Sequence, residues 1–282
     1  PGDLRFPNFP TMQHTVVTRT TNTLNSMVSN KEKYYVPQRA SAGLDPWVTP
    51  QAYDNAKEFF DTGITWSNSL NVAQMLDKSS YSISLGNTHQ DGIISSTGMD
   101  RYNVKVSADT KLTNNWSSGF TANYITTSID KAVTSGNGLL RTVYAAPPSY
   151  DLAGIPSHVD GNPYTQNSFR GSFDNAYWAM ENNKFTEDTN RFFGNVYASY
   201  QTDFGTTNHK LNAKYMVGVD AYTTHYVDSY GYGSNTGGGR GQIENYGWTN
   251  ATYNSLLTIN YDWRINEDWG LNAVLGERNY PK

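Results

Sequence analysis

The residues best suited to chemistry in this sequence are aromatic and charged side chains in two stretches without a regular pattern, residues 129–189 and 223–250. Aromatic rings stack on the faces of sugars, and Asp and Arg side chains hydrogen-bond polar ligands at a wet surface. The alternative is that the same rings pack these stretches together. The candidate ligand-binding residues are Tyr144, Tyr150, Asp151, Tyr164, Arg170, Trp178, Tyr230, Tyr232 and Arg240.

Catalysis and metal binding find little support elsewhere in the chain. There are five His and no Cys, and no two His have the spacing of a metal motif such as HExxH. Asp151 and Asp160 would suit a glycosidase only at a fixed separation, which nothing here sets. The stretch GYGSNTGGGRGQ lacks the GK[ST] ending of a phosphate-binding loop. We therefore predict no enzyme activity, no catalytic residue, no metal and no cofactor.

Composition indicates an all-β protein with wet surfaces. Of the 282 residues only 37% are hydrophobic, yet 14% are aromatic, including 21 Tyr; disordered chains are poor in aromatics. No run of apolar residues approaches the 18 or so of a membrane-spanning helix. The net charge of −4 and the absence of a Lys/Arg run argue against nucleic-acid binding.

The elements that must position the candidate residues are strands with one apolar and one polar face. In residues 80–124, Tyr81, Ile83 and Leu85 alternate with Ser and Gly, and Val104 and Val106 alternate with polar residues. Successive side chains of a strand point to opposite faces. Such alternation over about ten residues is typical of a barrel with lipid outside and water inside.

Eight strands are expected in all, and their connections alternate in length. The strands are predicted at residues 64–74, 80–90, 99–112, 116–128, 190–203, 209–222, 251–265 and 269–279. Short turns would then lie at one end of the sheet and the long stretches 91–98, 129–189 and 223–250 at the other, as in outer-membrane barrels. Residues 64–282 are therefore predicted to be part of an antiparallel transmembrane β-barrel with long external loops.

Residues 1–63 are expected to be rich in loops, with one possible strand in 13–28 and a short helix in 50–63, started by Pro50 and ended by Gly63. The first ten residues lack the pattern of a signal peptide. Since the alternating strands imply export, the chain is expected to be a fragment of a longer precursor.

Three stretches within residues 84–196 carry a family resemblance, and they are SLGNTHQDGIISSTGMDRYNVKVSADTKLTNNW, RTVYAAPPSYDLAG and FDNAYWAMENNKFTEDTNRFFGNV. In this order they resemble segments of the SusC-like (RagA-type) family of TonB-dependent outer-membrane transporters. The family's proline is replaced by Ala176 in the third stretch. Three ordered matches are more specific than any single motif.

The resemblance implies a barrel of about 22 strands, of which this chain would supply about seven or eight. It also implies a plug, a SusD-like surface lipoprotein as lid, and energy from the TonB complex through an N-terminal region missing here. The implied function is import of an oligomeric nutrient, glycan or peptide, across the outer membrane of a Gram-negative bacterium. Two alternatives remain open, a small passive barrel and a secreted carbohydrate-binding β-sandwich.

Overall fold

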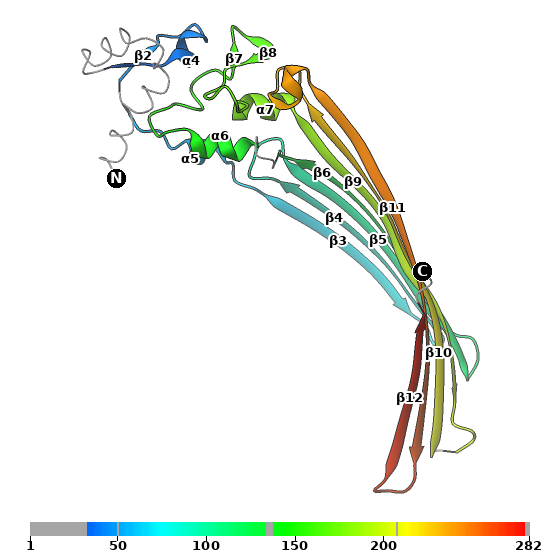
Figure 1. The fold of residues 1–282 in the computed structure, drawn as a ribbon. Helices are drawn as coiled ribbons and strands as arrows, with labels where there is room; N and C mark the ends of the chain where they lie inside the picture. The colour runs from blue at the N-terminus through cyan, green and yellow to red at the C-terminus, as the bar shows by residue number, and fades with distance from the viewer. Residues whose placement is uncertain (1–32, 50, 134–137, 207, 280–282) are drawn as a thin grey trace.

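One antiparallel sheet of eight strands dominates the computed structural model, which describes residues 33–49, 51–133, 138–206 and 208–279 (Figure 1). Its order is β12-β11-β10-β9-β6-β5-β4-β3, so each strand pairs with the strands of this sheet that precede and follow it in the chain. The predicted all-β class and all eight predicted strands are confirmed. The strands are β3 (Thr65–Met75), β4 (Ser79–Asp91), β5 (Gly98–Lys111), β6 (Trp116–Lys131), β9 (Lys184–Thr202), β10 (His209–Tyr230), β11 (Gln242–Arg264) and β12 (Gly270–Asn279).

Cross-strand register sorts the side chains onto an apolar face and a polar face. Leu85 lies opposite Val104, which lies opposite Tyr124 on β6. One residue along β5, Lys105 lies between Ser84 and Asn123. Because a one-residue slip would exchange the two faces, the alternation itself holds this register.

The apolar face has no second layer over it among the described residues. Ile83 is 45% exposed and Val196 is 53% exposed, although both lie in the middle of their strands. A β-sandwich would bury these side chains between two sheets. The sandwich alternative therefore does not fit this part of the chain.

The sheet is open. Its edge strands are β3 and β12, and they do not pair with each other. The described strands thus form a curved wall (Figure 1), as expected for part of a barrel, and not the closed eight-stranded barrel of the other alternative.

Short and long connections lie at opposite ends of the sheet, as predicted. The turns after β3, β5 and β11 (76–78, 112–115 and 265–269) lie at the end remote from the helices (Figure 1). At the other end, residues 92–97, 132–183 and 231–241 connect the strands.

The predicted loops 129–189 and 223–250 are too long, because the strands continue into them. β10 has 22 residues and β11 has 23, and their ladder runs on to the pair Tyr230 and Gln242. Past Ala221 both faces of the hairpin carry polar residues, such as Thr223 and His225 on one face and Thr224 and Asp228 on the other. The alternation that marks a strand in sequence fades there, while the backbone hydrogen bonds that make the strand persist.

Residues 33–49, 51–63 and 138–183 fold together at the long-loop end, and we call this part the cap. It contains the helices α4 (Pro37–Ala40), α5 (Asn55–Phe59), α6 (Leu139–Ala145) and α7 (Ala176–Asn182) and the short strands β1 (Tyr34–Tyr35), β2 (Trp47–Val48), β7 (His158–Val159) and β8 (Asn162–Gln166). None of the described helices is long and apolar enough to cross a membrane.

The helix predicted in residues 50–63 is confined to α5. Asp54, not Pro50, begins it, because the Asp54 carboxylate accepts a hydrogen bond from the Lys57 amide at 3.1 Å. The strand predicted in residues 13–28 lies outside the described residues.

The buried apolar core lies in the cap. Phe59 from the N-terminal segment clusters with Val143, Leu152 and Trp178 from the connection between β6 and β9. Across the same junction, the Leu152 amide donates to Asn55 Oδ1 at 3.1 Å. These contacts join segments about a hundred residues apart, so no local pattern predicts them.

Candidate binding site on the polar face

Polar and aromatic side chains from β5, β9 and β10 contact one another on the polar face of the sheet. The Tyr197 hydroxyl donates to Asp109 at 2.5 Å, and Lys214 Nζ lies 4.0 Å from the centre of the Tyr197 ring. Gly119 lies between Asp109 and Tyr197 in register, and a Cβ there would come within 2.2 Å of Asp109 Oδ1. Because Gly119 has no side chain, the Tyr197 hydroxyl can reach Asp109.

Three aromatic rings form a shelf on the polar face where β10 and β11 rise towards the cap. We call Tyr226, Tyr246 and Trp248 the aromatic shelf. Tyr226 and Tyr246 are direct cross-strand partners, stacked with their ring centres 5.0 Å apart and their planes 8° apart. Trp248 lies 5.2 Å from Tyr226. Tyr246 is 44% exposed and Trp248 is 51% exposed, so both retain ring surface for a ligand.

Charged side chains surround the aromatic shelf. Lys131 Nζ lies 4.5 Å from the centre of the Tyr226 ring and pairs with Glu187 at 3.3 Å. Asp228 and Glu244 lie directly opposite each other across β10 and β11. Like charges in such positions repel each other. These two carboxylates therefore destabilise the β10–β11 hairpin when no ligand is bound.

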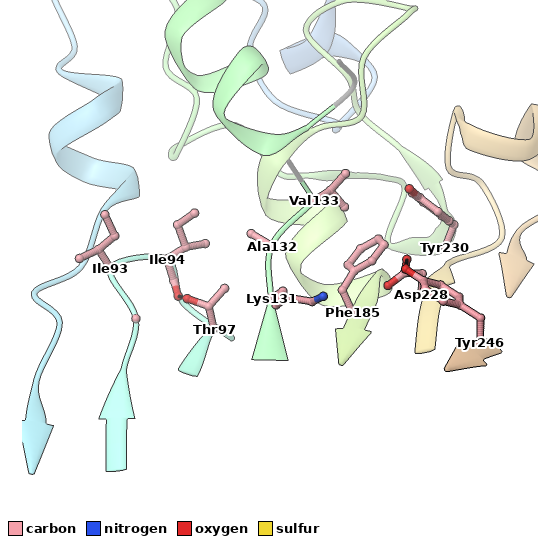
Figure 2. A pocket seen from close by; sticks show the side chains of 11 residues that line it. Ile93, Ile94, Thr97, Lys131, Ala132, Val133, Phe185, Asp228, Tyr230 and Tyr246 are labelled. Atoms are coloured by element: carbon pink, nitrogen blue, oxygen red, sulfur yellow. Dashed lines mark hydrogen bonds between the residues drawn. The ribbon is translucent and has the colours of Figure 1, made fainter. Parts of the chain in front are cut away.

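A cavity of about 640 Å³ opens beside the shelf, below the helices of the cap (Figure 2). Lys131, Phe185, Asp228, Tyr230 and Tyr246 line it from the sheet, and the connection 92–97 closes it on the other side. Phe185 and Tyr230 meet edge to face at 5.0 Å. The volume of this cavity is typical of a pocket that binds a small molecule.

The Tyr230 phenol stays protonated at this site. Tyr230 is the last residue of β10. It lies outside the apolar band of the hairpin, whose last cross-strand pair is Ala221 with Ala251. Burial raises its pKa, and the nearby carboxylates of Asp228 and Glu244 add to the increase. The hydroxyl therefore remains available as a hydrogen-bond donor.

A buried carboxylate fixes the connection 231–241 to the cap above the cavity. Asp174 accepts hydrogen bonds from Ser234 Oγ at 2.6 Å and from the Asn235 amide at 2.7 Å. Gly233, at a φ of 101°, passes so close to Tyr164 that a Cβ would lie 2.2 Å from its carbonyl oxygen. Only glycine suits this crossing, and the two connections are held as one unit.

Two of the sequence-predicted residues lie inside the cap. Trp178 has no exposed surface and donates through Nε1 to the Pro163 carbonyl at 2.8 Å. Tyr150 is 2% exposed and packs against Phe169 at 4.8 Å. Both rings hold the cap together, as the packing alternative describes.

Most of the other predicted residues are exposed on the cap or on the connection 231–241. Tyr164 and Tyr232 form an exposed edge-to-face pair at 5.7 Å, and Tyr144 is 68% exposed. Asp151 accepts from the Gly154 amide at 2.7 Å within a local turn. Arg170 and Arg240 are exposed, and the Arg170 guanidinium lies 5.2 Å from the Phe173 ring.

Of the predicted set, only Tyr230 lines the cavity. Sequence reasoning missed Lys131, Phe185, Tyr226, Asp228, Glu244 and Tyr246 as site residues. A signal was present, because Tyr226, Asp228 and Tyr230 recur at every second position, as do Glu244, Tyr246 and Trp248. Extending the strands past residues 222 and 250 would have placed both series on one face.

No group of three or more His, Asp or Glu side chains within the described ranges is placed to hold a metal ion. The site can act through ring stacking, hydrogen bonding and charge. It is a surface of stacked rings and charged groups on the polar side of the sheet.

Fold and site together define the class as a segment of barrel wall with an open, polar, aromatic-rich interior face. No family model matches the chain, and no curated protein matches it in sequence. Among solved structures, "Structure of the RagAB peptide transporter" superposes on it with a TM-score of 0.67 at 15% identity, covering 96% of this chain and 31% of that chain. The predicted resemblance to SusC-like (RagA-type) transporters is thereby confirmed as a likeness of fold.

Two further structures describe the RagAB peptide importer in different states. The "closed-closed" state gives a TM-score of 0.66 at 16% identity, and the "open-open" state gives 0.64 at 14% identity. Each alignment covers 82% of this chain and 26% of the solved chain. The chain thus spans less than a third of the length of the proteins it resembles.

Proposed function

We propose that this chain is part of the wall of a TonB-dependent active transporter in the outer membrane of a Gram-negative bacterium. It would import an oligomeric nutrient, glycan or peptide, together with a SusD-like surface lipoprotein. The observation that carries the proposal is the exposed apolar face of a single-layer sheet whose other face is polar. Lipid on one side and water on the other satisfy both faces at once.

The length of the apolar band supports a membrane span. On β10 the apolar face runs from Leu211 to Ala221, close to the 9–11 residues of a tilted transmembrane strand. Residues 223–230 and 242–250 then project beyond the bilayer, and the cap lies outside the cell. The aromatic shelf would face the mouth of the barrel, where an incoming nutrient meets the wall.

The fold likeness and the sequence resemblance support the proposed partner and energy source. The SusD-like lipoprotein would cover the cap side, where Tyr164 and Tyr232 are exposed. Energy would come from the TonB complex through parts of the transporter beyond this stretch. The polar face would serve passage and binding, with no catalytic role.

Fractionation and uptake together test the proposal. We expect the native protein to be recovered from the outer-membrane fraction only with detergent, accompanied by a surface lipoprotein. A deletion strain should lose growth on either a peptide mixture or an oligosaccharide mixture, and the intact gene should restore it. Recovery in soluble form without detergent would refute the proposal.

A further inference from the structure

We propose that the aromatic shelf and its cavity form a subsite for a cationic group, the ammonium or guanidinium of a basic peptide. This inference rests on the proposed function and deepens it, because it selects basic peptides over neutral glycans as ligands of this site. Three features of the described residues carry it: the ring faces, the charge balance and the cavity.

The ring faces already hold a cation of the chain itself. Lys131 Nζ lies over Tyr226 at 4.5 Å, within the range of a cation–π contact. Tyr246 stacks on the same Tyr226 ring, and Trp248 lies beside it. Tyrosine and tryptophan rings are the electron-rich surfaces that attract ammonium and guanidinium groups. A ligand cation would use the exposed surface of Tyr246 and Trp248 as Lys131 uses Tyr226.

The charge balance of the site is negative. Lys131 contributes one positive charge, while Glu187, Asp228 and Glu244 contribute three negative ones, which leaves −2. Within the described ranges neither Asp228 nor Glu244 belongs to a salt bridge; Asp228 accepts from the Tyr246 hydroxyl at 3.2 Å and Glu244 from the Gln242 side chain. Both donors are neutral, so they satisfy hydrogen bonds without compensating charge.

A cation between these carboxylates would relieve their repulsion. Asp228 and Glu244 are direct partners across the hairpin, and Asp228 lines the cavity with Tyr230 and Tyr246. A neutral pyranose would gain stacking on the shelf and leave the two charges uncompensated. A Lys or Arg side chain gains both stacking and an ion pair, and the cavity of about 640 Å³ has room for it with adjoining backbone.

Binding to the intact detergent-purified protein, with any partner that stays bound, tests the subsite. The probes are the end-blocked peptide Gly-Gly-Lys-Gly-Gly, the same peptide with norleucine in place of Lys, and maltopentaose. Isothermal titration calorimetry measures the affinity of each at low and at high salt. The variants are Asp228→Asn with Glu244→Gln, Tyr246→Leu, and Tyr246→Phe, which keeps the ring. Asp188→Asn is the matched control, since Asp188 lies on the opposite face of β9 and accepts from Ser128.

We expect the Lys peptide to bind more tightly than the norleucine peptide, and salt to reduce the difference. The double charge variant should weaken Lys-peptide binding about tenfold and remove the preference, with Tyr246→Leu acting in the same direction. Tyr246→Phe and Asp188→Asn should retain it. Retention by these two variants also shows that the protein remains folded.

Equal affinity for the two peptides, or no binding of either, would overturn the inference. So would a site that binds maltopentaose through Tyr246 and ignores the loss of both carboxylates, because the shelf would then be a sugar platform. A protein that fractionates with the outer membrane and imports a nutrient while showing either result refutes the subsite alone. Soluble recovery refutes the proposed function, and the binding assay is interpreted in the same way in that case.

Discussion

Two buried tyrosines in the cap differ in whether their hydroxyl groups are hydrogen-bonded. Tyr34 and Tyr150 are each 2% exposed. The Tyr34 hydroxyl donates to the Ser149 carbonyl, whereas the Tyr150 hydroxyl has no hydrogen-bond partner among the described residues. A buried polar group without a partner costs free energy, and one with a partner contributes a modest net stabilisation. The Tyr34 hydroxyl therefore stabilises the cap, whereas the Tyr150 hydroxyl destabilises it.

Removing each hydroxyl separates these contributions. We expect Tyr34→Phe to destabilise the cap by about 1 kcal/mol, because the Ser149 carbonyl loses a donor. Tyr150→Phe should leave stability unchanged or slightly raised. Hydrogen exchange of the cap amides measures both. Equal losses from the two substitutions would contradict this assignment.

At the scale of elements, adjacent residues of one strand meet opposite environments. Ile83 of β4 lies on the apolar face, between Val72 and Val106 in register. The next residue, Ser84, lies on the polar face and donates to Asn71 at 3.0 Å. Under the proposed function, this register places the apolar face against lipid and the polar face against water.

Arginine placed at each of these positions tests the orientation. We expect Ile83→Arg to cost about 2–4 kcal/mol in a bilayer, where lipid cannot solvate the guanidinium. Ser84→Arg, its matched control, should cost far less, because water reaches the polar face. The fraction of folded protein in lipid vesicles, followed by its heat-modifiable mobility in gels, gives both values. A larger loss from Ser84→Arg would reverse the assignment of the faces.

At the scale of the whole molecule, the wall and the cap are held by different forces. The wall depends on a continuous ladder of backbone hydrogen bonds between eight strands. The cap depends on a small buried cluster that includes Tyr34, Tyr150 and Trp178. Burial raises the pKa of the Tyr34 and Tyr150 phenols above the usual value near 10.

Alkaline pH should therefore loosen the cap before the wall. Below about pH 10 both phenols are protonated in the folded and unfolded states, and their full contribution to stability is present. Above it the unfolded state loses protons first, so the free energy of unfolding of the cap falls as pH rises. We expect phenolate absorption and tryptic cleavage at Lys57 to appear together, while far-ultraviolet circular dichroism still reports the sheet. Simultaneous loss of the sheet would contradict this order.

The eight strands of the wall could be predicted from the sequence. Alternation in β4, β5, β6 and β10 separates apolar from polar residues on the two faces, and each residue carries that information locally, so strands and faces could be predicted together. Past Ala221 polar residues occupy both faces, the alternation fades, and the length of the β10–β11 hairpin could not be predicted. Tyr226 and Tyr246 of the aromatic shelf were missed because the strands were ended at residues 222 and 250, although both residues belong to series that recur at every second position.

Which aromatic rings are buried and which are exposed depends on contacts between segments that are distant in the sequence. Tyr150 and Trp178 are residue types that commonly contact ligands. Their side chains are nevertheless buried in the cap, against a segment about a hundred residues away in the sequence. Tyr226 and Tyr246 come from two strands and become a surface only through their register. Burial and ring stacking depend on contacts between segments that are distant in the sequence. Only the folded structure brings those segments together.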